Sequence, residues 1–517
     1  MPAADPNTYG ASWYAATAVA VPPRPRLAVE LDVDVCVIGG GLAGLTTARE
    51  VARRGWSVVV LEAQRIACHA SGRNTGFVLP GFAADPRVVV ARVGLAHARS
   101  LWALSAAGVE YVRQAARAAG MPGVELEAGG WLRVSKTDPA FPPQALVDLL
   151  AGELGIAVET WSAERVRDEL RSPLYFGGLH YPHAFCLHPL NYALGLAAAA
   201  EAAGARICEE TPALEIDPAG VRKRVVTPAA RVRAAHVVLA GNIQIRALMP
   251  QIAATLIPIS TYVVTTAPLG DTIKDAIRYR GAVSDTELAD NHYRVVDSDR
   301  LMWSGRCSVW RGRPQRYVKA LIRDLVRTYP QLGRVPVEYA WRGTLGNTVH
   351  RMPQIGEVAP GLWLLSGFGG HGLNTTAMGG EIIARAIVEG DQTWRLFVPF
   401  ELVHAGGLFG RAVAQICYWG NRARERLQGP LARKRDAAQR HDAERRRLAA
   451  EKAKAGATPA RPSPGEPGAV PASAAAAAQE AKGSALAPTS SLVLPPVEFV
   501  ATGAQPGGAP SSADERA

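Results

Sequence analysis

Residues 34–44 read DVCVIGGGLAG, and this stretch decides the fold. The run from 34 to 38 is short and mostly apolar, which is typical of a buried parallel strand. Gly39, Gly41 and Gly44 follow at GxGxxG spacing. In that motif the first glycine permits a tight turn, the second lets the backbone approach a pyrophosphate, and the third lets a helix pack closely on the strand. The stretch therefore predicts a strand, a dinucleotide-binding turn and a helix.

The residues that follow complete the same unit. We expect a helix over 42–54 and a second buried strand over 57–61, because helix formers give way there to a run of valines. Glu62 ends that strand, where a carboxylate in such units holds ribose hydroxyls. The helix N-terminus would supply amides and partial positive charge to the phosphates. Residues 33–62 are thus predicted to form a dinucleotide-binding βαβ unit.

Apolar runs continue to alternate with glycine and proline up to a break in composition near Gly429-Pro430. We expect helices over 189–203 and 375–388, and buried strands over 205–209, 235–240 and 362–366. Long insertions with mixed strand and helix character separate these pieces. The predicted fold class is α/β: a Rossmann-type dinucleotide-binding domain interleaved with a mixed-sheet domain of α+β character, followed by a disordered C-terminal tail.

The positive charge of the chain is concentrated near its end. The formal net charge is +11, but residues 421–456 hold 12 Lys or Arg and 5 Asp or Glu. That segment predicts a solvated helix or charged tail and a weak interaction site. Residues 457–517 contain 17 Ala and 10 Pro and are predicted to be disordered. The remaining 1–420 are only mildly basic, which argues against a nucleic-acid-binding core.

Cysteine spacing and hydropathy favour a cytoplasmic protein. The six cysteines are scattered, and no pair stands at CxxC spacing, so neither a disulfide framework nor a metal site is indicated. The first 26 residues lack the charged and apolar regions of a signal peptide. We find no apolar stretch of the roughly 20 residues that an integral membrane segment needs.

A second glycine-rich turn distinguishes between the dinucleotides. GxGxxG alone does not separate NAD from FAD, but residues 367–372 read GFGGHG after the strand at 362–366 and before a helix. The helix that follows such a turn has partial positive charge at its N-terminus, which suits the electron-rich N1/C2 carbonyl edge of a flavin. We therefore predict FAD.

The chain resembles a known family over residues 10–425 or so, the D-amino-acid-oxidase-type FAD-dependent amine oxidoreductases, and within them the gamma-glutamylputrescine oxidase group. The motifs that carry the resemblance keep their order and spacing along the chain. They are Ser12-Trp13-Tyr14, the GxGxxG segment with Leu61-Glu62-Ala63, Ala70-Ser71-Gly72-Arg73-Asn74, the segment 258–269, Tyr293-Arg294, the segment 300–306, Trp341-Arg342-Gly343, the segment 353–356 and the GFGGHG turn.

The resemblance implies bound FAD and oxidation of a C–N bond in an amine. Hydride would pass to flavin N5, the imine would hydrolyse, and O2 or another acceptor would reoxidise the flavin. It also implies interleaved domains. We expect an N-terminal arm over 1–30, an FAD-binding domain from 31–84, 188–246 and 346–428, a substrate domain from 85–187 and 247–345, and a charged helix or tail over 429–456.

We expect the FAD contacts to come from the two glycine turns and the loop after Glu62. They are Gly39, Gly41, Leu42, Ala43, Gly44, Glu62, Ala63, His69, Ser71, Gly72, Arg73, Asn74, Ala213, Ala240, Gly241, Gly367, Gly370, His371, Gly372, Leu373 and Asn374. His69 has three interpretations: a covalent histidyl–flavin bond, as the His-Ala-x-Gly pattern of dimethylglycine-dehydrogenase-type relatives implies, a non-covalent flavin contact, or a space-filling residue. Arg73 could place a positive charge beside the ring.

The candidate catalytic residues are His69, Arg73, Trp303, Tyr262 and Arg306. Sarcosine-oxidase-type relatives hold a substrate carboxylate with a lysine where this chain has Asn374, and use a second lysine near Trp303. The departures favour a larger amine, or one whose acid lies far from the reacting carbon. Further candidates for the substrate face are Tyr293, Arg294 and Trp341. Arg294 and Arg306 are candidates for binding an acidic group on the substrate.

Two alternatives remain open. One is a demethylating, sarcosine-type oxidoreductase that acts on N-methyl amino acids. The other is a flavoprotein with mainly a binding or assembly role, for which the stripe Phe409, Val413, Ile416, Cys417 and Leu427 could form a docking helix. We expect that stripe to pack into the core instead.

Overall fold

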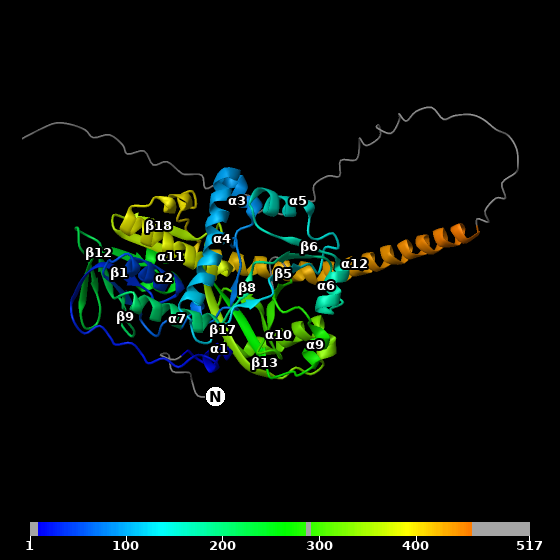
Figure 1. Cartoon of the computed structure of the whole chain (residues 1–517), viewed down its shortest axis with the longest axis horizontal. Coiled ribbons are helices and arrows are strands. Elements are labelled where there is room, and N and C mark those ends of the chain that lie inside the picture. Colours follow the sequence, from blue (N-terminus) through cyan, green and yellow to red (C-terminus); the bar gives the residue numbers. More distant parts are fainter. Residues whose placement is uncertain (1–8, 286–290, 457–517) are drawn as a thin grey trace, which may run out of the picture. The chain divides into compact units, whose positions relative to one another are not determined.

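The computed structural model describes residues 9–285 and 291–456 (Figure 1). Of these described residues, those up to Ala449 form one compact unit, and the stretch 450–456 belongs to a second unit. The tail prediction for 457–517 lies outside the described residues. The compact unit is built from two eight-stranded sheets, a small three-stranded sheet and the helices around them. The predicted mixed α/β fold is confirmed.

The first sheet contains the βαβ unit. Its strands are β1 (Leu31–Ile38), β2 (Val58–Leu61), β9 (Arg206–Cys208), β10 (Glu215–Asp217), β11 (Lys223–Val226), β12 (Arg231–Leu239), β18 (Gln354–Ala359) and β19 (Leu362–Ser366). The order is β10-β11-β12-β1-β2-β9, with β19 paired to β12 and β18 to β19. The central pairs β12–β1, β1–β2, β2–β9 and β12–β19 are parallel, as a Rossmann-type sheet requires.

The second sheet has the order β17-β13-β16-β15-β14-β5-β7-β6, and the third has the order β3-β8-β4. Their strands are β3 (Phe77–Val78), β4 (Glu127–Ala128), β5 (Trp131–Val134), β6 (Glu159–Trp161), β7 (Gly178–Tyr181), β8 (Phe185–Cys186), β13 (Ile257–Thr266), β14 (Ala282–Ser284), β15 (His292–Val296), β16 (Arg300–Ser308) and β17 (Val337–Asn347). The two large sheets thus draw on alternating stretches of the chain. The division into domains stays a prediction.

Helices cover both sheets. They are α1 (Trp13–Ala16), α2 (Leu42–Arg53), α3 (Pro86–Val93), α4 (Leu95–Ala118), α5 (Gln144–Val147), α6 (Ala163–Leu170), α7 (Pro189–Ala202), α8 (Pro250–Ala253), α9 (Thr272–Ala276), α10 (Gln315–Thr328), α11 (Gly372–Glu389) and α12 (Gly407–Gly456). Short 3-10 segments are η1 (Ala70–Gly72), η3 (Asn242–Ala247), η4 (Pro330–Leu332), η5 (Gly369–His371) and η6 (Thr393–Phe397), and η2 (Asp148–Glu153) is a π-helix. Within the described ranges, none of these helices combines the length and apolar character that crossing a membrane requires.

The packing of β1 explains why the first glycine motif positions the site. Val35 and Val37 face the core under α2, α7 and α11, whereas Cys36 and Ile38 face the opposite layer, because side chains alternate along a strand. α2 lies close against β1: a Cβ on Gly44 would be 2.0 Å from the carbonyl oxygen of Gly39. This contact admits only glycine and directs the first turn of α2 at the end of the sheet.

The N-terminal arm is pinned beside α7 by His188. The Nδ1 atom of His188 accepts a hydrogen bond from the Asn191 amide, which caps α7, and its Nε2 lies 3.0 Å from Thr17 Oγ1. Its ring packs against those of Trp13 and Tyr14. Burial, helped by the charge of Arg294, lowers the pKa of His188 to about 4.

This histidine should make the fold sensitive to acid. An unfolded histidine titrates near 6.5, so between pH 6.5 and 4 the unfolded chain binds the proton that folded His188 refuses. Stability therefore falls as the pH drops through that window, and between pH 7 and pH 5 this group accounts for a loss of about 2 kcal/mol. Denaturant unfolding at pH 7 and pH 5 measures the loss, and His188→Gln should reduce it. An unchanged pH dependence in the variant would contradict this account.

Candidate functional site

One large cavity, of about 1550 Å³, is lined by residues of both large sheets. Its walls are the turn between β1 and α2, the loop from Leu61 to Thr75, η3, the 311–315 loop, β17 and the turn before α11. Ligand sites usually measure about 300–1,000 Å³. This volume has room for a dinucleotide together with a substrate.

The βαβ end of the cavity is built to accept a dinucleotide. Gly39 has a φ of +113°, and Gly41 and Leu42 line the cavity at the start of α2. The Leu42 amide donates to Ser71 Oγ at 3.1 Å, which ties the glycine turn to the loop after β2. The remaining amides of the first helical turn have no partner inside the helix, and they are the usual donors to a phosphate.

Glu62 stands on the cavity wall at the predicted place. Its carboxylate accepts hydrogen bonds from the Gly40 amide at 2.7 Å and the Gln64 amide at 2.8 Å. Burial is the largest influence on this group and raises its pKa, against the pull of those two amides. A carboxylate offers about four acceptor positions, so two remain for ribose hydroxyls.

The turn before α11 supplies a second helix N-terminus to the same cavity. Gly370, His371, Gly372 and Leu373 line it, and a Cβ on Gly370 or Gly372 would meet nothing within 4 Å. His371 Nδ1 is buried and has no hydrogen-bond partner within the described part of the chain. Burial lowers the pKa of His371 to about 4. Two open helix N-termini, a carboxylate on the cavity wall at the end of β2 and an unpaired buried nitrogen fit a bound FAD.

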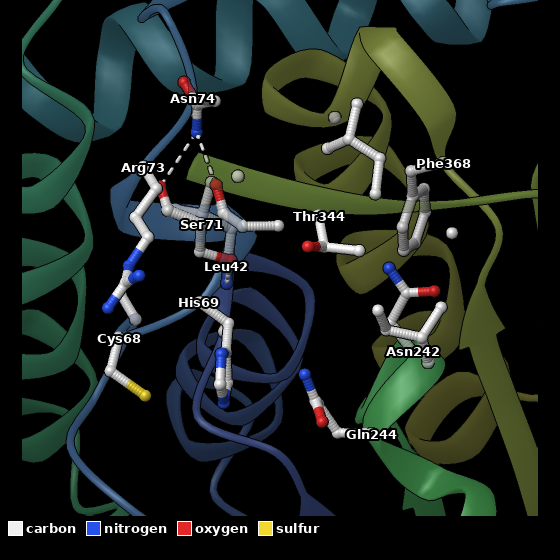
Figure 2. Close-up of a pocket in the computed structure, with 18 of the residues that line it drawn as sticks. Leu42, Cys68, His69, Ser71, Arg73, Asn74, Asn242, Gln244, Thr344 and Phe368 are labelled. Carbon is white, nitrogen blue, oxygen red and sulfur yellow. Dashed lines mark hydrogen bonds between the residues drawn. The ribbon is translucent and has the colours of Figure 1, made fainter. Parts of the chain in front are cut away.

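The loop from Cys68 to Asn74 forms one side of the cavity (Figure 2). Asn74 closes it by donating to the Ala70 and Ser71 carbonyls at 3.2 and 2.8 Å. Figure 2 shows His69 on this side, with Asn242 and Gln244 of η3 on the other. His69 and Arg73 are therefore brought together at the cavity, as are Ser71 and Asn74.

His69 lines the cavity and is exposed to it. The walls of the cavity nevertheless exclude much of the solvent from around its ring. That burial, with the charges of Arg73, Arg311 and Arg342, lowers its pKa to about 4. The imidazole can therefore accept a proton or a hydrogen bond at a ring nitrogen at pH 7.

Positive charge dominates the lining. Arg73, Arg311, Arg313 and Arg342 line the cavity, and Glu62 is the one carboxylate on its wall within residues 9–285 and 291–456. Arg342 donates to the Gly312 carbonyl at 2.9 Å, and Arg73 donates to the Tyr9 carbonyl at 3.2 Å. None of the four has a carboxylate partner in those ranges.

Three of the predicted catalytic residues do not line the cavity. Tyr262 and Trp303 are fully buried, on the far side of the second sheet from their cavity-lining neighbours Thr261 and Ser304. The reason is the alternation of side chains along β13 and β16. Arg306 also lies elsewhere, because it pairs with Asp324 at 2.6 Å. These positions do not support direct contact with a substrate.

Among the residues predicted for the substrate face, and Asn374, some line the cavity and others are buried behind its wall. Trp341 lines the cavity, and its indole donates to the Arg73 carbonyl at 3.1 Å. Tyr293 stacks on Trp303, and Arg294 is buried against Glu127 at 2.6 Å. Asn374 is also buried, behind the wall, and donates to Gly81 and Ser105.

Three predicted glycines shape the site from outside the lining. Gly44 seats α2 on β1, as described above. A Cβ on Gly72 would be 2.5 Å from the Ala67 carbonyl oxygen, and one on Gly367 would be 2.6 Å from Thr348. The other predicted FAD contacts line the cavity; they are Gly39, Gly41, Leu42, Ala43, Glu62, Ala63, His69, Ser71, Arg73, Asn74, Ala213, Ala240, Gly241, Gly370, His371, Gly372 and Leu373.

Sequence reasoning missed Arg311, Arg313 and the two polar residues Asn242 and Gln244. Both arginines follow β16 in a segment, RGRP, that carries no acid, and this was a usable signal. Asn242 begins η3, three residues after the end of β12, and adopts a φ of +48°, which a sequence does not reveal. Strained backbone of this kind concentrates at functional sites.

Comparisons with known proteins agree with this geometry. The family model described as DAO, FAD dependent oxidoreductase, matches residues 34–386. The chain is 31% identical over 385 residues to gamma-glutamylputrescine oxidoreductase of Escherichia coli, covering 74% of this chain and 89% of that protein. It is 29% identical over 385 residues to the probable oxidoreductase OrdL of Haemophilus influenzae, covering 72% and 87%. A solved glycine oxidase from Bacillus cereus has a similar fold, with a TM-score of 0.58 and 20% identity over 70% of this chain and 97% of that one.

Proposed function

The chain belongs to the DAO family of FAD-dependent oxidoreductases, and from that premise we propose that it oxidises a C–N bond in an amine that also carries an anionic group. The product is an imine, which water hydrolyses. FAD, when bound, would supply the acceptor for the hydride, which carries both electrons away from the substrate carbon, while the nitrogen gives up a proton to solvent.

The proposal of an anionic substrate rests on the charges of the cavity wall, where four arginines face a single carboxylate among the described residues. Arg311 and Arg342 stand close enough to act on His69 electrostatically, together with Arg73. A guanidinium group binds a carboxylate through paired, charge-assisted hydrogen bonds. The E. coli relative is named for gamma-glutamylputrescine, an amine with a carboxylate far from the terminal nitrogen, and such a molecule would satisfy this arrangement.

The chain's own groups have defined tasks in this proposal. The adenosine and pyrophosphate part of FAD would be held by Glu62, Ser71 and the amides at the start of α2. Arg311 and Arg342 orient the anionic end of the substrate. His69 accepts a hydrogen bond from the substrate amine, which binds as the free base after its ammonium proton has passed to solvent.

An anaerobic substrate screen tests the proposal. Amines with and without a remote carboxylate are mixed with the holoenzyme, and loss of the visible flavin absorbance reports oxidation. We expect bleaching by gamma-glutamylputrescine and little by sarcosine. Bleaching by sarcosine alone would favour the demethylating alternative and overturn the proposal. Admission of air then shows whether O2 or another acceptor reoxidises the flavin.

His69 gives a separate prediction. Because it lines the cavity, we expect His69→Ala to change the flavin reduction potential or to lower kcat roughly tenfold, the loss expected for one hydrogen bond. Acid precipitation of the unmodified protein then separates the two kinds of contact: colour in the pellet means a covalent bond, and colour in the supernatant means a non-covalent contact. A variant with unchanged potential, spectrum and kcat would leave His69 as a space-filling residue.

A further inference from the structure

Helix α12 carries an apolar surface that faces away from the body of the protein. Its inner side is fixed by Gln415, which accepts from the Val309 amide at 3.0 Å, and by Tyr418, whose hydroxyl accepts from the Cys307 amide at 3.0 Å. Arg422 completes that side by pairing with Asp324 at 3.2 Å. These residues are three and four positions apart, so they share one helix face.

The opposite side is where the predicted stripe lies. Phe409, Ile416 and Leu427 are 77%, 62% and 70% exposed, so the expectation that the stripe packs into the core is wrong for these residues. At 100° per residue, the exposed apolar side chains occupy an arc of about 140°, from Leu408 and Trp419 next to the inner side to Val413 and Leu431 opposite it, and they extend for about 35 Å along the helix. The residues of this arc, which we call the outer face, are Leu408, Phe409, Val413, Ile416, Trp419, Leu427 and Leu431.

The same helix is strongly basic. Residues 407–449 hold 11 Lys or Arg and 4 Asp or Glu. Arg424 and Arg426 are exposed at the two edges of the outer face, and Lys434 and Arg445 continue its direction beyond Leu431. The combination is an aromatic and aliphatic strip flanked and extended by positive charge.

We propose that the outer face of α12 binds the surface of an anionic lipid bilayer, with the helix lying in the plane of the interface. Trp, Phe and Leu on one side of a helix that is rich in Lys and Arg are the features of such interfacial helices. The negative surface of anionic lipids attracts clustered Lys and Arg while the apolar side chains insert at the headgroup boundary.

A second copy of the chain is the competing occupant of this face. Two outer faces in contact would bring two helices of net positive charge side by side, and their like charges would oppose the contact. An anionic bilayer offers an apolar interior to the exposed apolar side chains and negative headgroups to the Lys and Arg side chains, so charge complementarity favours it over a second copy.

Sedimentation of the full-length holoenzyme with vesicles tests the proposal. We expect the protein to sediment with vesicles that contain phosphatidylglycerol, and to stay in solution with vesicles of phosphatidylcholine alone or at high salt. The combined variant Phe409→Ser, Ile416→Ser and Trp419→Ser should lose at least about tenfold in vesicle affinity, because it removes the inserting side chains. The variant Lys434→Glu with Arg445→Glu should lose a similar factor.

Matched controls separate this effect from damage to the fold. Val221 is 86% exposed and lies in the loop before β11, so Val221→Ser removes an exposed apolar side chain elsewhere and should bind vesicles normally. Each variant must keep its flavin absorbance. The proposal is overturned if the unmodified protein stays in solution with phosphatidylglycerol vesicles, as it would if residues 491–500 covered the face. It is also overturned if the apolar variant binds normally, or if light scattering shows that this variant merely converts a dimer to a monomer.

Discussion

Gly41→Val should yield a folded protein that contains less than a tenth of the FAD of the unmodified enzyme and is inactive. Gly41 lines the cavity at the start of α2, and a Cβ there would lie 2.9 Å from Ser71 Oγ. The larger valine would push the Ser71 side chain away from the Leu42 amide and occupy the space in which a pyrophosphate approaches the backbone. Flavin absorbance per protein measures the FAD content, and circular dichroism shows whether the variant is folded.

Two other glycines make the test specific. A Cβ on Gly152 would meet nothing within 4 Å, so Gly152→Val should keep its FAD. At Gly44 the Cβ would collide with the Gly39 carbonyl oxygen at 2.0 Å, and we expect Gly44→Val to fold poorly. Normal FAD content in Gly41→Val would show that the turn does not face the pyrophosphate.

The βαβ unit could be predicted because its signals are local. Each glycine of the motif has a steric reason within a few residues of itself, and the valine runs of β1 and β2 are buried on both faces. Boundaries were less accurate where a strand is only half buried. β12 begins at Arg231, earlier than expected, because its first residues alternate between exposed and buried while pairing with β11.

The substrate side could not be predicted in the same way. Whether Tyr262 or Thr261 faces the cavity depends on which face of the second sheet meets the first, and no local signal fixes that choice. Tyr262 instead supports the site from behind: its hydroxyl accepts from the Gly312 amide at 2.9 Å and so holds the loop that carries Arg311. The chain has far more arginines than the cavity uses, and only the folded arrangement shows which of them lack an acidic partner.

The stripe on α12 was misjudged for a related reason. Its spacing correctly indicates one apolar side of a helix, but a helical period does not say whether that side faces the core or the solvent. The residues that pin the helix, Gln415, Tyr418 and Arg422, are polar, and their partners lie some 100 residues earlier in the sequence. The orientation is thus decided by hydrogen bonds that the hydrophobic pattern does not contain.

Arg342→Gln should lower kcat/KM for a carboxylate-bearing amine roughly 10- to 100-fold, the loss expected for a hydrogen bond between charged groups. Arg311→Gln should act in the same direction. The comparison that isolates the charge is between such an amine and its carboxamide analogue, each assayed with every variant. Both variants should lose discrimination between the two compounds, chiefly through a higher KM for the acid, since the arginines hold a part of the substrate remote from the reacting carbon.

Arg306→Gln is the informative control for this prediction. The sequence named Arg306 as a site candidate and Arg342 only as part of a family motif, but Arg306 pairs with Asp324 beside α12, so its loss should lower stability and leave the discrimination intact. FAD content must be measured in each variant, because an arginine that held a cofactor phosphate would lose flavin when replaced. If Arg342→Gln releases FAD, or keeps the full preference for the acid over the amide, then the cavity arginines do not select the substrate, and the anionic substrate class we propose is wrong.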